Sequence, residues 1–375
     1  MIRQQGARPL YCAVLVSFSV GLACTALPSD RAREPSSLPP ESRAVLRELR
    51  HPDGLHRVVA GRLTDSTAWV ANGDPPDVSR FTIVDGALTH RFGRVGDGPG
   101  ELRRIISLDV MGGDTLVLVD VALARVSQFT ADGTLLRSVS LRMPPYASVV
   151  ACHQHAGSQR CVVRERPDPR TIPEAGMGWD SVYVASLRRG DDSTLTLERI
   201  TEALAGSPIR RVPHPGGVRI RVDEQAADLF LEARDPIEAI PSGGQRRMLW
   251  RNGAWVAAPL RSDLAASRPL SADASLDRTI ATASWVEDGS VWIAEQQERD
   301  GTRAWWRVDC EGGAVARTRL PASFVALHAR AQHLLGRTTD SLGEQRIVLA
   351  ILDGVATDST PACRARVHSA DDAAR

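Results

Sequence analysis

A pattern of short apolar strands and glycine turns recurs along the chain and limits the fold more than any other feature. Its clearest copy begins with Asp114–Asp120, an apolar run between turn residues, and continues through Val126–Phe129. A turn at Asp132–Gly133 then leads to a further strand pattern over Thr134–Leu141. An Asp-Gly pair between two such runs predicts a β-hairpin. The continuous apolar run indicates a strand that is buried on both faces of its sheet.

The same order of elements returns in Ser66–Phe92 and in Asp288–Leu320. Each copy spans roughly 40 residues, which lies within the range of propeller repeats. One copy cannot bury both faces of its own sheet, whereas copies stacked around an axis cover one another. We therefore predict an all-β fold, a six-bladed β-propeller with four-stranded antiparallel blades.

The predicted blades follow the turn signals, although the pattern weakens between Pro144 and Thr279. Leu229–Glu238 and Val325–Leu335 fit short helices as well as strands or loops. An N-terminal strand within residues 43–60 is expected to complete the last blade, since closure from both chain ends removes exposed sheet edges. The expected blades cover residues 61–92, 104–141, 147–200, 216–260, 280–320 and 324–352.

The glycine-rich stretch GRVGDGPGEL, Gly93–Leu102, raises the alternative of a phosphate-binding loop. Such a loop needs a lysine and a Ser or Thr at the start of a helix. Here Gly100 is followed by Glu101, whose negative charge would repel a phosphate. We predict that this stretch connects two blades, with glycines permitting positive φ and Pro99 stiffening the turn.

The segment Arg91–Leu141, RFGRVGDGPGELRRIISLDVMGGDTLVLVDVALARVSQFTADGTLLRSVSL, resembles the six-bladed β-propellers related to NHL repeats that occur in exported bacterial proteins. Trp285–Leu320 is a weaker match. The resemblance implies the fold; many members of the group have no assigned activity. Some are metal-dependent lactonases or a zinc-dependent amidating lyase, with ligands on the inner strands. On that precedent, Asp109 and Glu287 are candidate metal ligands, with turn formation at strand ends as the alternative.

The N-terminus has the features of an export signal. Arg3 and Arg8 precede an apolar run, Leu10–Ala23, that is short for a membrane span. The run ends in Gly21-Leu22-Ala23-Cys24, which resembles a bacterial lipobox except for Gly21; cleavage after Ala26 is the alternative. The expected organisation is a signal peptide over residues 1–23, a flexible tether over 24–42, the propeller over 43–355 and a tail over 356–375. Cys24 is the candidate lipidation site.

Export changes the interpretation of the cysteines, because an oxidising compartment permits disulfides. Cys152 and Cys161 flank the short polar stretch HQHAGSQR, which favours a hairpin with a bridge between them. Cys310 and Cys363 would then form a second bridge. Metal binding by these four cysteines is the weaker alternative, since no Cys-x-x-Cys occurs.

Charge and composition exclude several classes of function. All 46 basic residues are arginine and the formal net charge is +1. The absence of lysine excludes Schiff-base and P-loop lysines, and the balanced charge argues against a nucleic-acid partner. Arginine pairs such as Arg103-Arg104, Arg210-Arg211 and Arg246-Arg247 are interpreted as solvated strand ends or loops.

No zinc-protease, nucleophile-elbow or EF-hand motif occurs in the sequence. The only close histidine pair, His153-Gln154-His155, is expected in an exposed hairpin loop, with a metal site as the alternative. Trp69, Trp285 and Trp292 are expected to pack between blades. Trp179 lies near a loop, where core packing is the favoured interpretation and stacking on a sugar or anchoring of a peptide is the alternative.

These observations predict an exported, monomeric binding or scaffold module of the periplasm or cell envelope. Loops on one propeller face would hold a protein, peptide or glycan partner, with membrane contact only through the lipid anchor. No cofactor is predicted. The alternative is a metal-dependent hydrolase or lyase, lactonase-like, with its site in the central channel and Asp109 and Glu287 among its ligands.

Overall fold

The computed structural model describes part of the chain. The chain divides into two compact units, residues 1–36 and residues 37–375, and every described residue belongs to the second. No helix among the described residues is long and apolar enough to cross a membrane. The described residues are 39, 41–112, 114–155, 158–172, 177–190, 194–214, 217–222, 229–232, 238–241, 246–251, 254–259, 280–286, 290–309 and 314–355.

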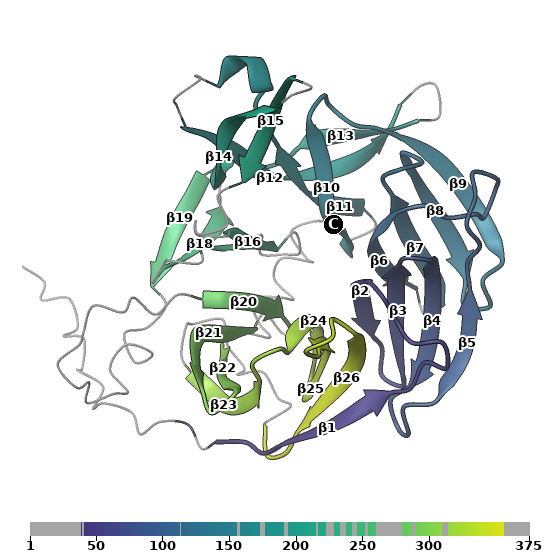
Figure 1. Ribbon diagram of the computed structural model, residues 1–375, viewed down its shortest axis with the longest axis vertical. Helices are drawn as coiled ribbons and strands as arrows, with labels where there is room; N and C mark the ends of the chain where they lie inside the picture. The colour runs from purple at the N-terminus through teal and green to yellow at the C-terminus, as the bar shows by residue number, and fades with distance from the viewer. Residues whose placement is uncertain are drawn as a thin grey trace, which may run out of the picture. The chain divides into compact units, whose positions relative to one another are not determined.

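The second unit consists of antiparallel sheets in which consecutive strands pair in order (Figure 1). A short 3-10 helix, η1 (Pro169–Thr171), interrupts the strands. The first three groups of paired strands are β2 (Val58–Leu63), β3 (Thr67–Gly73), β4 (Pro76–Thr82) and β5 (Leu88–Phe92); β6 (Ile105–Met111), β7 (Thr115–Asp120), β8 (Arg125–Thr130) and β9 (Leu135–Arg142); and β10 (Ala147–His155), β11 (Ser158–Glu165), β12 (Met177–Arg189) and β13 (Leu195–Arg199). The next two are β16 (Leu229–Glu232), β17 (Glu238–Pro241), β18 (Arg246–Arg251) and β19 (Ala254–Pro259); and β20 (Ile280–Trp285), β21 (Val291–Arg299), β22 (Thr302–Val308) and β23 (Ala314–Pro321).

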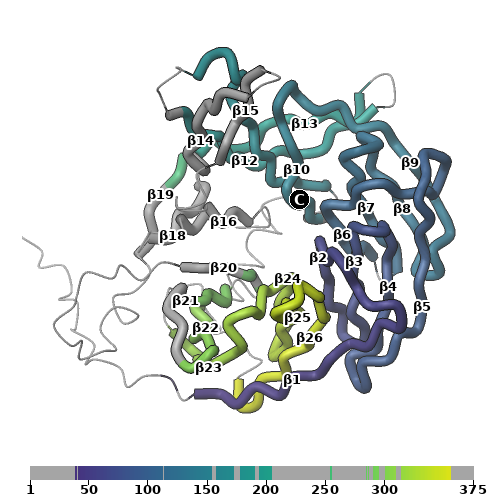
Figure 2. Tube along the Cα trace, viewed as in Figure 1, coloured from purple at the N-terminus to yellow at the C-terminus, as the bar shows by residue number. Residues whose placement is uncertain are grey.

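The last sheet joins the two ends of the second unit. Its strands β24 (Val325–Arg330), β25 (His333–Thr339) and β26 (Gln345–Leu352) are completed by β1 (Ala44–Leu49). β1 pairs antiparallel with β26, from Ala44 opposite Leu352 to Leu49 opposite Ile347. The purple N-terminal strand accordingly lies beside the yellow C-terminal one in Figure 1 and Figure 2. This pairing confirms the predicted closing strand.

The groups contact one another in chain order, mostly through their first strands. β2 contacts β6, β6 contacts β10, and β24 contacts both β20 and β2; β16 contacts β12 and β20. The series of contacts thus starts at β2 and returns to β2. The described residues form an all-β, propeller-like fold.

The second strand of a sheet is buried on both faces, as the apolar run in Asp114–Asp120 predicts. In β7, Leu116 and Leu118 pack with Trp69 of the preceding sheet. Val117 and Val119 pack with Tyr183 of the following group. Alternating residues of one strand therefore contribute to two separate apolar clusters, which explains why the sequence of this strand does not alternate.

The tryptophans follow the same packing. Trp69 and Trp292, expected between blades, are almost fully buried. The adjacent Trp305 and Trp306 are both buried as well. Trp179 differs, because 54% of its surface is exposed.

The glycine-rich stretch connects β5 to β6, as predicted. Leu102 is fully buried and pairs with Val95 in an isolated bridge. The Glu101 carboxylate accepts a hydrogen bond from the Gly98 amide (2.7 Å), and Gly100 has a φ of 78°. The Glu101 carboxylate thus already binds the Gly98 amide, a backbone donor that a phosphate-binding loop would have to offer to its ligand.

Two regions differ from the expected pattern. β9 pairs in parallel with β13, so the second and third groups share one larger sheet. Between them and β16 lies an additional hairpin, β14 (Leu204–His214) and β15 (Gly217–Val222), which pairs with β12. The expected blade over residues 216–260 therefore begins later, at Leu229. The two segments that also fitted helices contain strands β16 and β24, because tertiary pairing overrides weak local preference.

Candidate functional site

A β-bulge recurs in the first strands of five of the six groups of paired strands. In each strand the register against the second strand shifts past one extra residue, namely Val59, Ile106, Val150, Ala281 and Leu327. Bulges re-aim the side chains that follow them. The third residue after the extra one is polar in all five strands: Arg62, Asp109, His153, Ser284 and Arg330.

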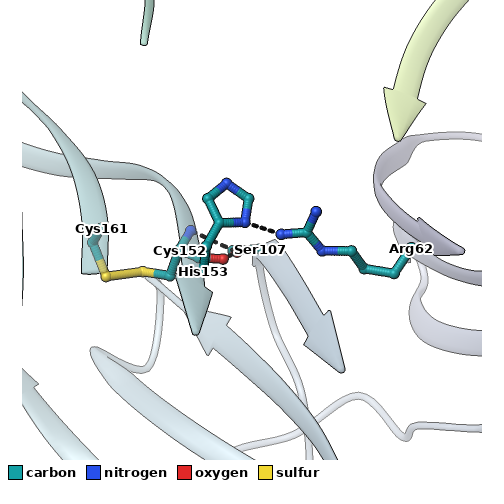
Figure 3. The surroundings of a disulfide bond; sticks show 5 residues. All are labelled: Arg62, Ser107, Cys152, His153 and Cys161. Carbon is teal, nitrogen blue, oxygen red and sulfur yellow. Dashed lines mark hydrogen bonds between the residues drawn. A yellow bond between two sulfur atoms is a disulfide. The ribbon is translucent and has the colours of Figure 1, made fainter. Parts of the chain in front are cut away.

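Three of these residues contact one another and form the polar cluster (Arg62, Asp109 and His153). Arg62 Nε lies 2.9 Å from Asp109 Oδ1, and both residues are buried, with 6% and 9% of their surface exposed. Arg62 Nη2 also hydrogen-bonds His153 Nδ1, as Figure 3 shows. A guanidinium has no acceptor, so Nδ1 of His153 accepts this bond. One arginine of β2 therefore holds β6 and β10 together.

Ser107 and His328 share another position, the first after the extra residue, and both bind the backbone of a neighbouring first strand. Ser107 Oγ accepts a hydrogen bond from Cys152 N (2.9 Å) and donates one to Cys152 O (3.3 Å). His328 Nδ1 accepts from Leu63 N (3.2 Å). These side chains thus provide hydrogen-bond partners for backbone groups of Cys152 and Leu63 on the side of each strand that faces away from its paired strand.

Cys152 and Cys161 lie directly opposite each other in β10 and β11 and form a disulfide. Both are fully buried, among apolar residues that include Val117 and Val119 of the second group. The hairpin pattern predicts this bridge correctly. Cys310, Cys363 and Cys24 lie outside the described residues.

The histidine pair lies in a strand and not in the expected loop. His153, Gln154 and His155 belong to β10, and His155 pairs with Ser158 across the turn. The hairpin loop is thus shorter than the polar stretch suggests, because polar residues continue the ladder. His153 is half-buried and faces Arg62.

Of the two candidate carboxylate ligands, Asp109 lies in the described part of the chain and Glu287 lies outside it. Among the described residues, no group of three or more His, Cys, Asp or Glu could hold a metal ion. Asp109 instead lies against the Arg62 guanidinium. A divalent cation at this carboxylate would have to displace a buried positive charge.

Ser107 is engaged by the Cys152 backbone, and His153 Nδ1 is engaged by Arg62. A serine nucleophile needs a hydrogen bond to its base, which in turn needs a group that orients it. Ser107 and His153 Nδ1 both have other hydrogen-bond partners here.

Arg62 is the cluster residue that sequence reasoning missed. Asp109 and His153 stood out by residue type, whereas Arg62 is one of 46 arginines. An alignment of the first strands on their bulge residues would have singled out Arg62. The bulge residues are identified only from the strand pairing, which a single sequence does not show.

Two histidines elsewhere predict how stability depends on pH. Burial, and next the Arg91 guanidinium, lower the pKa of His51; burial, and next Arg47, lower the pKa of His333. The unfolded chain therefore binds protons more readily below the ordinary value of 6.5. Their contribution is complete above pH 6.5 and is lost as the pH falls through the folded-state values. We expect denaturant unfolding to show lower stability at about pH 5 than above pH 6.5.

Replacing both residues, His51→Gln and His333→Gln, should flatten this dependence. The matched control is His56→Gln, at an exposed histidine. An unchanged pH slope in the double variant would contradict the assignment.

Comparisons with known proteins add the fold context. No family model matches the chain, and no curated protein matches its sequence. The chain is similar in structure to a member of the DUF4221 family from Bacteroides vulgatus ATCC 8482 (9% identity, TM-score 0.49, covering 84% of this chain and 98% of that chain). It is also similar to regucalcin, a calcium-binding protein of Agrobacterium tumefaciens (12% identity, TM-score 0.45, 84% and 96% covered). A third similar structure is YCF48 bound to D1 peptide (13% identity, TM-score 0.41, 85% and 99% covered).

With TM-scores of 0.49 or less, these likenesses carry no argument about function. The class of protein follows from strand pairing and sheet contacts, which define a propeller-like all-β protein. Its particular feature is the polar cluster, which joins the first strands of three groups.

Proposed function

We propose that this protein is an exported, propeller-like binding or scaffold module of the cell envelope that recognises a protein, peptide or glycan partner. The observation that carries the proposal is the polar cluster, Arg62, Asp109 and His153, which three first strands bring together. Burying a charged pair rarely stabilises a fold more than apolar packing does. A role in recognition accounts for such a cluster better than stability alone.

The proposal includes the finer architecture. The six groups of four strands, with β1 completing the last, support six blades related to NHL repeats, within a propeller over residues 43–355. The chain is proposed to act as a monomer.

The cellular address belongs to the same proposal. The disulfide between Cys152 and Cys161 fits an oxidising compartment such as the periplasm. A signal peptide over residues 1–23, lipidation of Cys24 and a tether over residues 24–42 would place the propeller at the membrane surface. Cys310 and Cys363 are proposed to form a second bridge.

The test is a binding measurement on the purified mature protein and a His153→Gln variant, using a peptide library and a glycan array. Glutamine keeps a polar side chain but changes the acceptor that Arg62 contacts, so ligands recognised through the cluster should bind about tenfold more weakly. Arg188→Gln, at an exposed ion pair with Glu198, is the matched control. If no ligand binds, or if His153→Gln leaves every affinity unchanged, the cluster is not the recognition site. Metal-dependent hydrolysis of a lactone by the same preparation would favour the channel enzyme instead.

A further inference from the structure

The junction between β2 and the last sheet is built around the side chain of Arg337 in β25. Its Nη1 donates a hydrogen bond to the backbone oxygen of Val58, the buried first residue of β2 (2.8 Å). The same Nη1 lies 3.4 Å from Gln345 Oε1, and that oxygen also accepts a hydrogen bond from Val58 N (2.7 Å). Two side chains of the last sheet therefore bind both backbone groups of Val58.

The Arg337 guanidinium is only partly satisfied by these contacts. The residue is half-buried, and its Nε atom is buried without a hydrogen-bond partner among the described residues. In the part of the chain that the structure describes, nearby ion pairs use other arginines: Arg330 with Asp65, and Arg346 with Glu48 and Asp340. A half-buried donor without an acceptor is costly, so an acceptor from outside the chain would be favourable here.

A second arginine, Arg57, lies beside this guanidinium. It directly precedes Val58, whose carbonyl Arg337 binds. The backbone of Arg57 is fixed on both sides, because its N–H donates to Asn72 Oδ1 (3.0 Å) and its C=O accepts from Gly73 N (2.6 Å). Arg57 itself is exposed. The fold thus fixes the backbone of Arg57 at the junction and leaves the side chain at the surface.

The electrostatic surroundings of Arg337 differ from those of a paired arginine. Burial, and next the Arg57 guanidinium, lower the pKa of Arg337. Burial acts against the charge of Arg91 as well, but Asp77 and Asp53 raise the pKa of that residue above its ordinary value. Arg91 therefore has carboxylates that balance its charge, whereas the charged neighbour of Arg337 is a second cation.

We propose that Arg57 and Arg337 form a binding site for a phosphate group, with the side-chain amide of Gln345 as a further donor. A phosphate monoester carries a charge of about −1.5 to −2 at pH 7, which balances two guanidinium groups. The planar guanidinium also matches the oxygens of a phosphate. Gln345 Oε1 is occupied by Val58 N, so the amide nitrogen is left to donate.

This phosphate site is separate from the polar cluster. Arg57 lies at the start of β2, whereas Arg62 lies near the end of the same strand. The two sites share no residue, so each can be tested without the other. His153→Gln should therefore leave phosphate binding within about twofold of the wild-type affinity.

Thermal unfolding of the full mature protein in inorganic phosphate tests the proposal, at constant pH and with sodium chloride holding the ionic strength constant. A ligand that binds only the folded state raises the unfolding midpoint, and the concentration dependence gives an apparent Kd. Arg337→Gln and Arg57→Gln should each weaken phosphate binding by about tenfold, since each removes one charge-assisted contact. Arg346→Gln, at an exposed arginine of the neighbouring β26 with carboxylate partners, is the matched control and should stay within about twofold.

Arg57→Gln keeps the proposal testable even if loss of Arg337 weakens the junction itself. The Arg57 side chain is exposed, and the hydrogen bonds of its backbone do not require the guanidinium. Circular dichroism verifies that each variant keeps the wild-type fold. If phosphate does not raise the midpoint of the wild type, or if Arg57→Gln and Arg337→Gln both bind phosphate as the wild type does, the proposal is wrong.

Three further probes identify the source of the phosphate group. Binding of glycerol 3-phosphate with the same dependence on Arg57 and Arg337 would support a small soluble ester as the ligand. Binding to vesicles of phosphatidic acid that Arg57→Gln abolishes would support a lipid headgroup. Acetate that raises the midpoint as much as phosphate at equal ionic strength would show that the site does not select phosphate, and would overturn the assignment.

Discussion

Replacing Arg62 by methionine is expected to lower the free energy of unfolding by about 3–5 kcal/mol, because removing one partner of a buried ion pair leaves the other charge uncompensated. Asp109 keeps only 9% of its surface exposed and would lose the guanidinium that lies 2.9 Å from its carboxylate. His153 would also lose the donor of its Nδ1 hydrogen bond. Chemical denaturation of wild type and variant measures the difference.

The exposed pair of Arg188 and Glu198 provides the contrast. Its Nε–Oε2 distance is 2.8 Å, but about two thirds of each side chain is exposed, at 66% and 62%. Arg188→Met should therefore cost about 0–1 kcal/mol. The double variant Arg62→Met and Asp109→Leu should recover part of the loss, since two apolar residues leave no unpaired charge. A cost below about 1 kcal/mol for Arg62→Met would show that the cluster does not join the sheets.

Much of the fold follows from local patterns in the sequence. The apolar runs and Asp-Gly turns predict the strands of the first two groups closely, because each pattern lies within one hairpin. The closing strand β1 follows from a general argument, since an unpaired β26 would expose a sheet edge. Cys152 and Cys161 are also accessible from the sequence, because their spacing matches a hairpin.

The remaining features depend on pairing between distant segments. The extra residues such as Val59 and Ile106 look like ordinary strand residues, and only the register reveals them. The β14–β15 hairpin contains Pro208 and Pro213, which favour loops in isolation; both nevertheless lie within the paired range of β14. Arg62 gains its role from two strands that lie far away in the sequence. Single-sequence patterns do not contain this information.

Replacing both Cys152 and Cys161 by alanine is expected to cost about 2–4 kcal/mol of stability, because the bridge restricts the unfolded chain. The two residues are separated by 9 positions, so the closed loop is short. The replacement also removes two sulfur atoms from the apolar cluster between the second and third groups. Thermal unfolding in the absence of reductant should show a lower midpoint for the double variant.

Reductant distinguishes this bridge from effects of the other cysteines. A reducing agent should lower the thermal unfolding midpoint of the wild-type protein. It should lower the midpoint of the Cys152→Ala and Cys161→Ala double variant less, since the bridge is already absent there. Equal losses in both proteins would mean that the stabilising bridge lies elsewhere. The backbone of Cys152 hydrogen-bonds Ser107, and His153 is the next residue in β10. The same variant should therefore lower the affinity for any ligand that the polar cluster binds. Loss of stability without loss of that binding would show that the strand alone, without its bridge, holds His153 against Arg62.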